Sequence, residues 1–169
     1  MKHITSRALI FFCALSWLNS GFAVEIGSTA PNCALTQFST DKKHNLVEFR
    51  PKLVLVDFWT SWCGPCMKSF PYYNQLQQQF GDKDFQIVAV NLDEDLTDAQ
   101  AFIKRFPANF TVATDPEKQC AQQFSVVAMP SSYLIDRNGT VRHVHLGFRP
   151  DETGEVESKI KELLAEQQP

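Results

Sequence analysis

The chain has 169 residues, a formal net charge of −3 and a hydrophobic fraction of 44%. This length and composition fit one globular domain with a sizeable core and exclude a disordered chain. A mildly acidic balance without a basic run gives no support for nucleic-acid binding.

The first 23 residues differ from the rest of the chain. A basic head, Lys2 and Arg7, precedes an apolar stretch, and small residues at the positions read by a signal peptidase end it at Ala23. We therefore expect residues 1–23 to be a signal peptide that directs residues 24–169 to the periplasm as one domain. Cleavage changes the net charge from −3 to −5. An uncleaved membrane anchor is the alternative, although the uncharged stretch is shorter than the ~20 residues of a bilayer span.

After residue 23 the apolar pattern alternates between strand and helix spacing. In chain order, the expected elements are a hairpin of Ala34–Phe38 and Asn45–Phe49, a buried strand Leu53–Phe58, a helix from about Pro65 to Phe80, a strand Phe85–Asn91, a helix from Thr97 to about Phe106, a short strand Phe110–Ala113, a helix from Asp115 to Phe124, a hairpin of Ser131–Asp136 and Thr140–Leu146, and a helix Glu152–Glu166. This order predicts an α/β domain with a mixed sheet and helices on both faces.

Cys63 and Cys66 lie three positions apart, where the buried strand gives way to the helix. A cysteine at a helix N-terminus has its thiolate stabilised by unpaired N–H groups and by the helix dipole. Cys66, one turn later, is within reach to close a disulfide, so the pair predicts thiol–disulfide exchange. A structural zinc site is the alternative, but it needs a second cysteine pair, and Cys33 and Cys120 are lone residues.

With these motifs in place, the chain resembles the thioredoxin superfamily and, within it, the TlpA/ResA-like exported thiol–disulfide oxidoreductases. The resemblance is carried by Ala30-Pro31, Val56-Asp57-Phe58-Trp59, Trp62-Cys63-Gly64-Pro65-Cys66, Pro71, Met129-Pro130, Leu134-Ile135-Asp136 and Asn138-Gly139. It implies a thioredoxin fold with an N-terminal β-hairpin. It also implies that the helix and strand around residues 92–113 are the insertion typical of this branch.

The resemblance also implies roles for the cysteine motif. Cys63 resembles the exposed nucleophile that attacks a partner disulfide and forms a mixed disulfide, and Cys66 resembles the buried resolving thiol that releases the reduced partner. Gly64 and Pro65 set the turn and the helix start between them.

Substrate contact is expected at the loop that faces the cysteine pair across a gap. Pro130 resembles the family's cis-proline, which faces the two cysteines. The Met129 backbone before it can pair with an extended substrate segment, and Trp62 would extend the contact surface.

Two acids bear on proton transfer. Asp57 stands in the buried strand, where an unpaired carboxylate is costly, so its pKa is expected to rise and to suit a proton acceptor for Cys66. Glu94 falls where ResA-like proteins place their active-site glutamate. The alternatives are a satisfied structural acid for Asp57 and a solvated loop acid for Glu94.

The active site departs from the TlpA/ResA pattern. These proteins usually carry Asn where Asp57 stands and often Glu where Ser69 stands, while Gly64-Pro65 is the thioredoxin dipeptide itself. The more thioredoxin-like site favours a reducing couple over an oxidase.

Other cysteines and histidines were candidates for further sites. Cys33 and Cys120 could form a second, structural disulfide in an exported protein, or remain two buried thiols. His143 and His145 alternate on one strand and share a face, but without a third ligand they do not predict a metal site.

The sequence thus predicts a monomeric, exported reductase whose redox group is the Cys63–Cys66 disulfide, with no separate cofactor. The resemblance implies oxidised periplasmic proteins as partners, including apocytochromes c or copper-site proteins, and a membrane thiol reductase as electron donor. Two alternatives remain. A peroxiredoxin-like peroxidase would need a proline where Val56 stands, and a copper-handling thiolate module would need an additional ligand and is disfavoured by Pro130.

Overall fold

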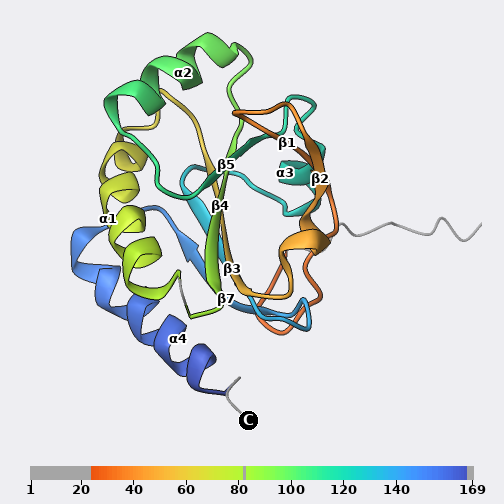
Figure 1. Cartoon of the computed structure of the whole chain (residues 1–169), viewed down its shortest axis with the longest axis vertical. Coiled ribbons are helices and arrows are strands. Elements are labelled where there is room, and N and C mark those ends of the chain that lie inside the picture. Colours follow the sequence, from red (N-terminus) through yellow and green to blue (C-terminus); the bar gives the residue numbers. More distant parts are fainter. Residues whose placement is uncertain (1–23, 82, 167–169) are drawn as a thin grey trace, which may run out of the picture.

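The computed structural model describes residues 24–81 and 83–166, and the predicted signal peptide lies outside them. The described strands form one sheet in the order β2-β1-β5-β4-β3-β6-β7 (Figure 1). The strands are β1 (Ala34–Gln37), β2 (Lys43–Asn45), β3 (Leu53–Trp59), β4 (Phe85–Asn91), β5 (Thr111–Thr114), β6 (Ser131–Ile135) and β7 (Val141–Leu146). The helices are α1 (Gly64–Phe80), α2 (Leu96–Arg105), α3 (Gln119–Gln123) and α4 (Thr153–Glu166), with short 3-10 helices η1 (Leu46–Phe49) and η2 (Pro150–Glu152). Across this part of the chain, no helix combines the length and apolarity that a bilayer crossing requires.

Strand β3 lies at the centre of the mixed sheet. It pairs in parallel with β4 and antiparallel with β6, while β4 and β5 are parallel and β6 and β7 antiparallel. Every residue of β3 is buried because helices cover both faces of the sheet. The α/β class and the mixed sheet predicted from the sequence are confirmed.

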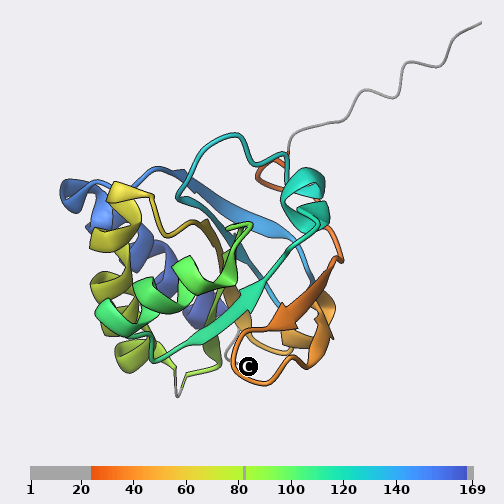
Figure 2. The ribbon, with the colours of Figure 1, turned by 90° about the horizontal axis from the view of Figure 1, so that it is seen from above.

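Alternate residues of β3 face different layers. Leu53 and Leu55 pack with side chains of α1 and α4, whereas Val54, Val56 and Phe58 pack with side chains of α3 and the N-terminal segment. Figure 2 shows this division: α1, α2 and α4 lie on one side of the sheet and the short α3 on the other. Asp57 follows the period of Leu53 and Leu55, so its side chain faces α1.

The N-terminal hairpin is shorter than the sequence predicted. Its second strand is Lys43–Asn45, and Leu46–Phe49, expected as strand, is the 3-10 helix η1. Asn45 starts this helix with a capping box, in which the Asn45 N–H donates to Glu48 Oε1 at 2.8 Å. This local hydrogen bonding competes with strand pairing.

The helix starts differ from the prediction by one residue in α1, α2 and α4 and by four in α3. α2 begins at Leu96, one residue before the predicted Thr97, and Asp95 is its cap, because Asp95 Oδ1 accepts the Thr97 N–H at 2.8 Å. α3 begins at Gln119 rather than Asp115, because Lys118 has a left-handed backbone with φ of 55° and so interrupts a helix before that point.

A disulfide joins Cys33, just before β1, to Cys120 in α3, the pair that the sequence offered as a second bridge. The two Cα atoms are 5.1 Å apart across a sequence separation of 87 residues, and both side chains are buried. The bridge ties the N-terminal segment to the helix that leads towards Pro130.

Candidate active site

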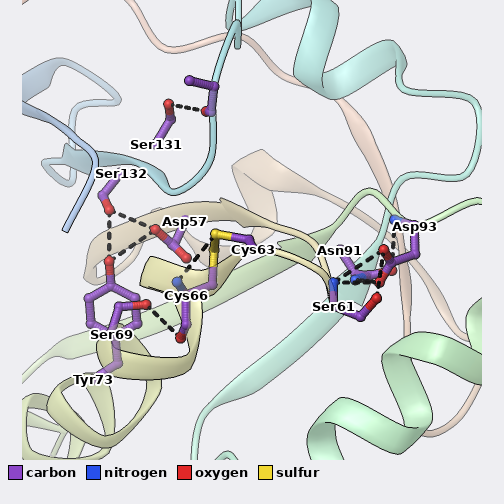
Figure 3. Close-up of a disulfide and its surroundings, with 11 residues drawn as sticks. Asp57, Ser61, Cys63, Cys66, Ser69, Tyr73, Asn91, Asp93, Ser131 and Ser132 are labelled. Atoms are coloured by element: carbon purple, nitrogen blue, oxygen red, sulfur yellow. Dashed lines mark hydrogen bonds between the residues drawn. A yellow bond between two sulfur atoms is a disulfide. The ribbon is translucent and has the colours of Figure 1, made fainter.

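Cys63 caps the N-terminus of α1 and is bonded to Cys66 (Figure 3). Its Sγ accepts the Cys66 N–H at 3.2 Å, so the sulfur already receives one of the free N–H groups of the first turn. Pro65 occupies the first turn, where its missing N–H costs nothing. This position stabilises a thiolate on Cys63.

The two cysteines differ in access to solvent. Cys63 is 4% exposed and Cys66 is fully buried, while the preceding Trp62 is 74% exposed. The difference between the sulfurs is small in this disulfide form. It has the direction needed for Cys63 to meet a partner first.

The peptide bond between Met129 and Pro130 is cis. Met129 packs against the cluster that contains both cysteines. A surface hollow of about 290 Å³ adjoins this loop and is lined by Thr60, Trp62, Leu92, Lys118, Ala121, Gln122, Val126, Val127 and Met129. The structure thus brings Trp62 and Met129, both predicted for substrate contact, to one groove.

Asp57 is fully buried among the residues that surround the disulfide (Figure 3). Tyr73 and Ser132 both donate to its Oδ1, at 3.0 and 2.7 Å, while Oδ2 is buried and has no hydrogen-bond partner among the described residues. Burial raises the Asp57 pKa to about 7, and the two hydroxyl donors oppose that rise. A carboxylate with such a pKa can exchange a proton with a thiol near neutral pH.

Glu94 lies at the surface. Its side chain is 89% exposed and pairs with Lys118 Nζ at 3.1 Å. Lys118 lines the groove beside Trp62, so Glu94 lies at the rim of the groove and makes no hydrogen bond to the cysteine motif in the described chain. Its role as the active-site glutamate of ResA-like proteins remains a prediction from the resemblance.

Sequence reasoning missed the buried acid Asp93. Its carboxylate accepts the Ser61 N–H at 2.9 Å, the Ser61 hydroxyl at 3.1 Å and the Asn91 side-chain amide at 2.8 Å. These bonds hold the loop between β3 and α1 against the end of β4. The polar residues at the end of the apolar strand β4 were the feature of the sequence that could have indicated this contact.

Sequence reasoning also missed the partners of Asp57. The helical spacing of Tyr73 indicates only a core residue, and nothing in the sequence singles out Ser132, since its contact with Asp57 spans 75 residues. Ser69, one turn after Cys66 and also buried, donates its hydroxyl to the Cys66 carbonyl at 3.2 Å. Tyr73 follows on the next turn, so one face of α1 connects Cys66 with the surroundings of Asp57.

No group of three or more His, Cys, Asp or Glu side chains within residues 24–81 and 83–166 is arranged to hold a metal ion. His143 and His145 lie on β7 with their rings stacked 6.3 Å apart. The structure contains the Cys63–Cys66 disulfide, which is the redox group predicted from the sequence.

Sequence comparison finds a matching family model and relatives among thiol-disulfide oxidoreductases. The family model described as Redoxin matches residues 25–164. Thiol-disulfide oxidoreductase ResA of Geobacillus thermodenitrificans is 34% identical over 74% of this chain and 71% of its own length. The ResA protein of Bacillus subtilis is also 34% identical, over 85% of this chain and 83% of its own length.

Solved structures of proteins described as thiol-disulfide exchange proteins share this fold. A crystal structure described as a thiol:disulfide interchange protein DsbE from Chlorobium tepidum shares 44% identity with a TM-score of 0.80, over 84% of this chain and 99% of that chain. A thioredoxin domain of a thiol-disulfide oxidoreductase from Bacteroides vulgatus shares 26% identity with a TM-score of 0.73, over 82% and 99% of the two chains.

The thioredoxin-like sheet and the cysteine pair at a helix N-terminus define a protein-disulfide oxidoreductase. The chain belongs to the redoxin family, on its TlpA/ResA-like branch.

Proposed function

We propose that this protein is an exported reductase of protein disulfides that works through Cys63 and Cys66. The observation that carries the mechanism is the buried carboxylate of Asp57, whose Oδ2 has no hydrogen-bond partner among the described residues and whose pKa is raised to about 7. It can take the proton of a resolving thiol near neutral pH. The thioredoxin dipeptide Gly64-Pro65 between the cysteines supports the reducing direction.

The reaction starts from the dithiol form. The Cys63 thiolate attacks one sulfur of the partner disulfide, a Cys63–partner bond forms, and the other partner sulfur leaves as a thiolate that takes a proton from solvent. Asp57 then accepts the proton of Cys66. The Cys66 thiolate attacks Cys63 Sγ, closes the Cys63–Cys66 bond and releases the second partner thiolate, so two electrons pass to the partner.

The groove beside the cis-proline supplies the docking surface in this proposal. No turn or loop hydrogen bond of the described chain uses the backbone N–H or C=O of Met129, so both groups are available to an extended partner segment. Trp62 and Val127 are exposed apolar side chains of this groove. Glu94 and Lys118 form its charged rim and would contact the partner rather than the sulfurs.

The resemblance to ResA and DsbE proteins supports placement in the periplasm, with a cleaved signal peptide at residues 1–23. A protein that reduces others in an oxidising compartment needs a supply of electrons. We infer a membrane thiol reductase as donor and oxidised periplasmic proteins, such as apocytochromes c or copper-site proteins, as acceptors.

The equilibrium potential of the Cys63–Cys66 couple tests the direction. Residues 24–169 would be titrated in redox buffers, trapped by thiol alkylation and read by intact mass, with Cys63→Ser as the control that lacks the couple. A potential near that of thioredoxin, about −270 mV, supports a reductase. A value near the strongly oxidising end, about −120 mV, contradicts it and indicates a disulfide-forming oxidase.

A further inference from the structure

The proposed reaction leaves a proton on Asp57 that has to reach solvent before the next cycle. Asp57 and Cys66 are both fully buried, so neither exchanges protons with water directly. The proton returns through the cysteine site or leaves through the hydroxyl groups that contact Asp57. The geometry behind those hydroxyls distinguishes the two routes.

Asp57, Ser132 and His145 form a row across three neighbouring strands. Asp57 of β3 is paired with Ser132 of β6, and Ser132 is paired with His145 of β7. Residues directly opposite one another in antiparallel strands point to the same face of a sheet. The row therefore runs from the buried centre of the sheet to its edge strand on the face covered by α1 and α4.

The first contacts in this row are short. The Ser132 hydroxyl lies 2.7 Å from Asp57 Oδ1 and 2.9 Å from the Tyr73 hydroxyl. Each hydroxyl carries one proton and can accept another, so either can pass a proton on while it keeps a hydrogen bond to its neighbour.

A small cavity continues the row beyond Ser132. It has a volume of about 10 Å³, and its walls include Tyr73, Ser132, His143 and His145. The rest of its wall is mostly apolar and includes Leu55, Phe148 and Val156. A cavity of this size has room for about one water molecule, and the hydroxyl and imidazole groups of the wall are the partners that would hold it. Asp57 is not part of the wall, so the two hydroxyls stand between its carboxyl group and the cavity.

The histidines connect the cavity with the surface. His143 Nε2 is buried without a hydrogen-bond partner among the described residues. Burial lowers the His143 pKa, Glu155 opposes this shift, and His145 of β7 and Lys159 of α4 add to it. A neutral ring with a free nitrogen is a proton acceptor. His145 Nε2 lies 3.7 Å from Glu152 Oε2, a partly exposed carboxylate of η2.

We propose that the proton of Asp57 leaves through Ser132, one water in this cavity and the His143–His145 pair, and reaches solvent beside Glu152. This route rests on the proposed role of Asp57 as proton acceptor. The protonated carboxyl group of Asp57 first rotates so that its proton faces Ser132. It then gives this proton to the Ser132 oxygen while the Ser132 proton passes to the water. The water gives a proton to an imidazole, which releases one to Glu152 or to solvent. One proton crosses, Ser132 and the water end as they began, and no electron moves.

Time-resolved infrared spectroscopy of the reduced protein tests the route. A jump from below to above pH 7 deprotonates Asp57, and the loss of its protonated-carboxyl C=O band gives the rate; the band is assigned by its absence in Asp57→Asn. We expect Ser132→Ala and the double variant His143→Gln/His145→Gln to slow this rate by about tenfold or more. His44→Gln is the matched control, because His44 lies on β2 at the other edge of the sheet, and its rate is expected to match the wild type.

The equilibrium titration separates positioning from transport. The double histidine variant leaves both hydroxyl donors of Asp57 in place, so its Asp57 pKa is expected to stay at the wild-type value while the rate falls. An Asp57 that titrates at wild-type rate in the double variant overturns the exit route and leaves the acceptor role standing. An Asp57 that does not titrate at all in the reduced wild type overturns the acceptor role, and the exit route with it.

Discussion

Asp57 differs from a surface-exposed acid in three properties. It is fully buried, one of its oxygens holds two hydroxyl donors, and the other oxygen has no partner among the described residues. Burial dominates, so its pKa rises to about 7 despite the two donors. The charge of this single side chain therefore affects the stability of the fold and, in the proposed mechanism, the chemistry of Cys66.

Asp57 should make the free energy of unfolding fall as pH rises. Its pKa is raised from 3.8 to about 7 in the folded state, so the folded state binds the proton more tightly between these values and loses stability through that window. Asp57→Asn removes this titration. Its free energy of unfolding relative to wild type should increase by about 4 kcal/mol across the window, measured by urea unfolding of the disulfide form. Parallel pH curves for the two proteins would contradict this expectation.

Asp57→Asn should slow the resolution of the mixed disulfide and leave its formation unchanged. Without Asp57 the Cys66 thiol loses its proton acceptor, and we expect the mixed disulfide to resolve between about 10-fold and 100-fold more slowly. Stopped-flow single turnover with a chromogenic aromatic disulfide separates the two thiolate releases. In wild type the resolving rate should also fall as pH drops below about 7, because Asp57 is then protonated. A variant with the wild-type rate and pH profile would remove Asp57 from the mechanism.

The loop between β3 and α1 depends on a carboxylate from the end of β4. Asp93 accepts hydrogen bonds from the Ser61 backbone and from the Asn91 side chain. Asp93→Ala leaves the buried Asn91 amide and the partly buried Ser61 N–H unpaired and should cost about 2 kcal/mol. Faster hydrogen exchange at the Ser61 amide would show that the loss is local to the loop. Asp151→Ala, which changes an exposed acid of η2, is the control expected to leave that amide unaffected.

The Cys33–Cys120 bridge fixes α3, which carries part of the groove wall. The bridge closes a loop with a sequence separation of 87 residues, so the unfolded chain gains much conformational freedom when it is absent. The double variant Cys33→Ala/Cys120→Ala should lose about 4 kcal/mol in urea unfolding while the Cys63–Cys66 bond stays intact. A loss below about 1 kcal/mol would show that the bridge adds little to stability.

The direction of electron transfer is linked to the stability of the complete fold. A disulfide that is hard to reduce in the folded protein makes the disulfide form more stable than the dithiol form, whereas in a strong oxidant the reduced form is the stabilised one. We therefore expect the disulfide form to unfold with a higher free energy than the dithiol form, by more than about 1.4 kcal/mol, which corresponds to about 30 mV. Urea unfolding of both forms in the Cys33→Ala/Cys120→Ala background isolates the active pair. The opposite order would indicate an oxidase.

Elements with strong local patterns agree closely with their sequence predictions. Strand β4 spans Phe85–Asn91, the predicted range, and α1 starts one residue before the predicted Pro65. Elements whose boundaries depend on a single residue differ from their sequence predictions. The hairpin strand ended early because of the Asn45 capping box, and α3 started late because of the left-handed Lys118. Such boundaries depend on individual hydrogen bonds and dihedral angles, which hydrophobic periodicity does not report.

Local spacing along the chain was enough to place Cys63 at a helix start with Cys66 one turn later, and to bury Asp57 in a central strand, because these features follow from neighbouring residues. The fold alone decided that Ser132 and Tyr73 hold Asp57, that Asp93 anchors Ser61, that Cys33 meets Cys120 and that Glu94 pairs with Lys118 at the surface. These contacts depend on strand order and register between distant segments. A shift of one residue in that register turns a side chain to the opposite face of the sheet, and no local pattern in the sequence specifies it.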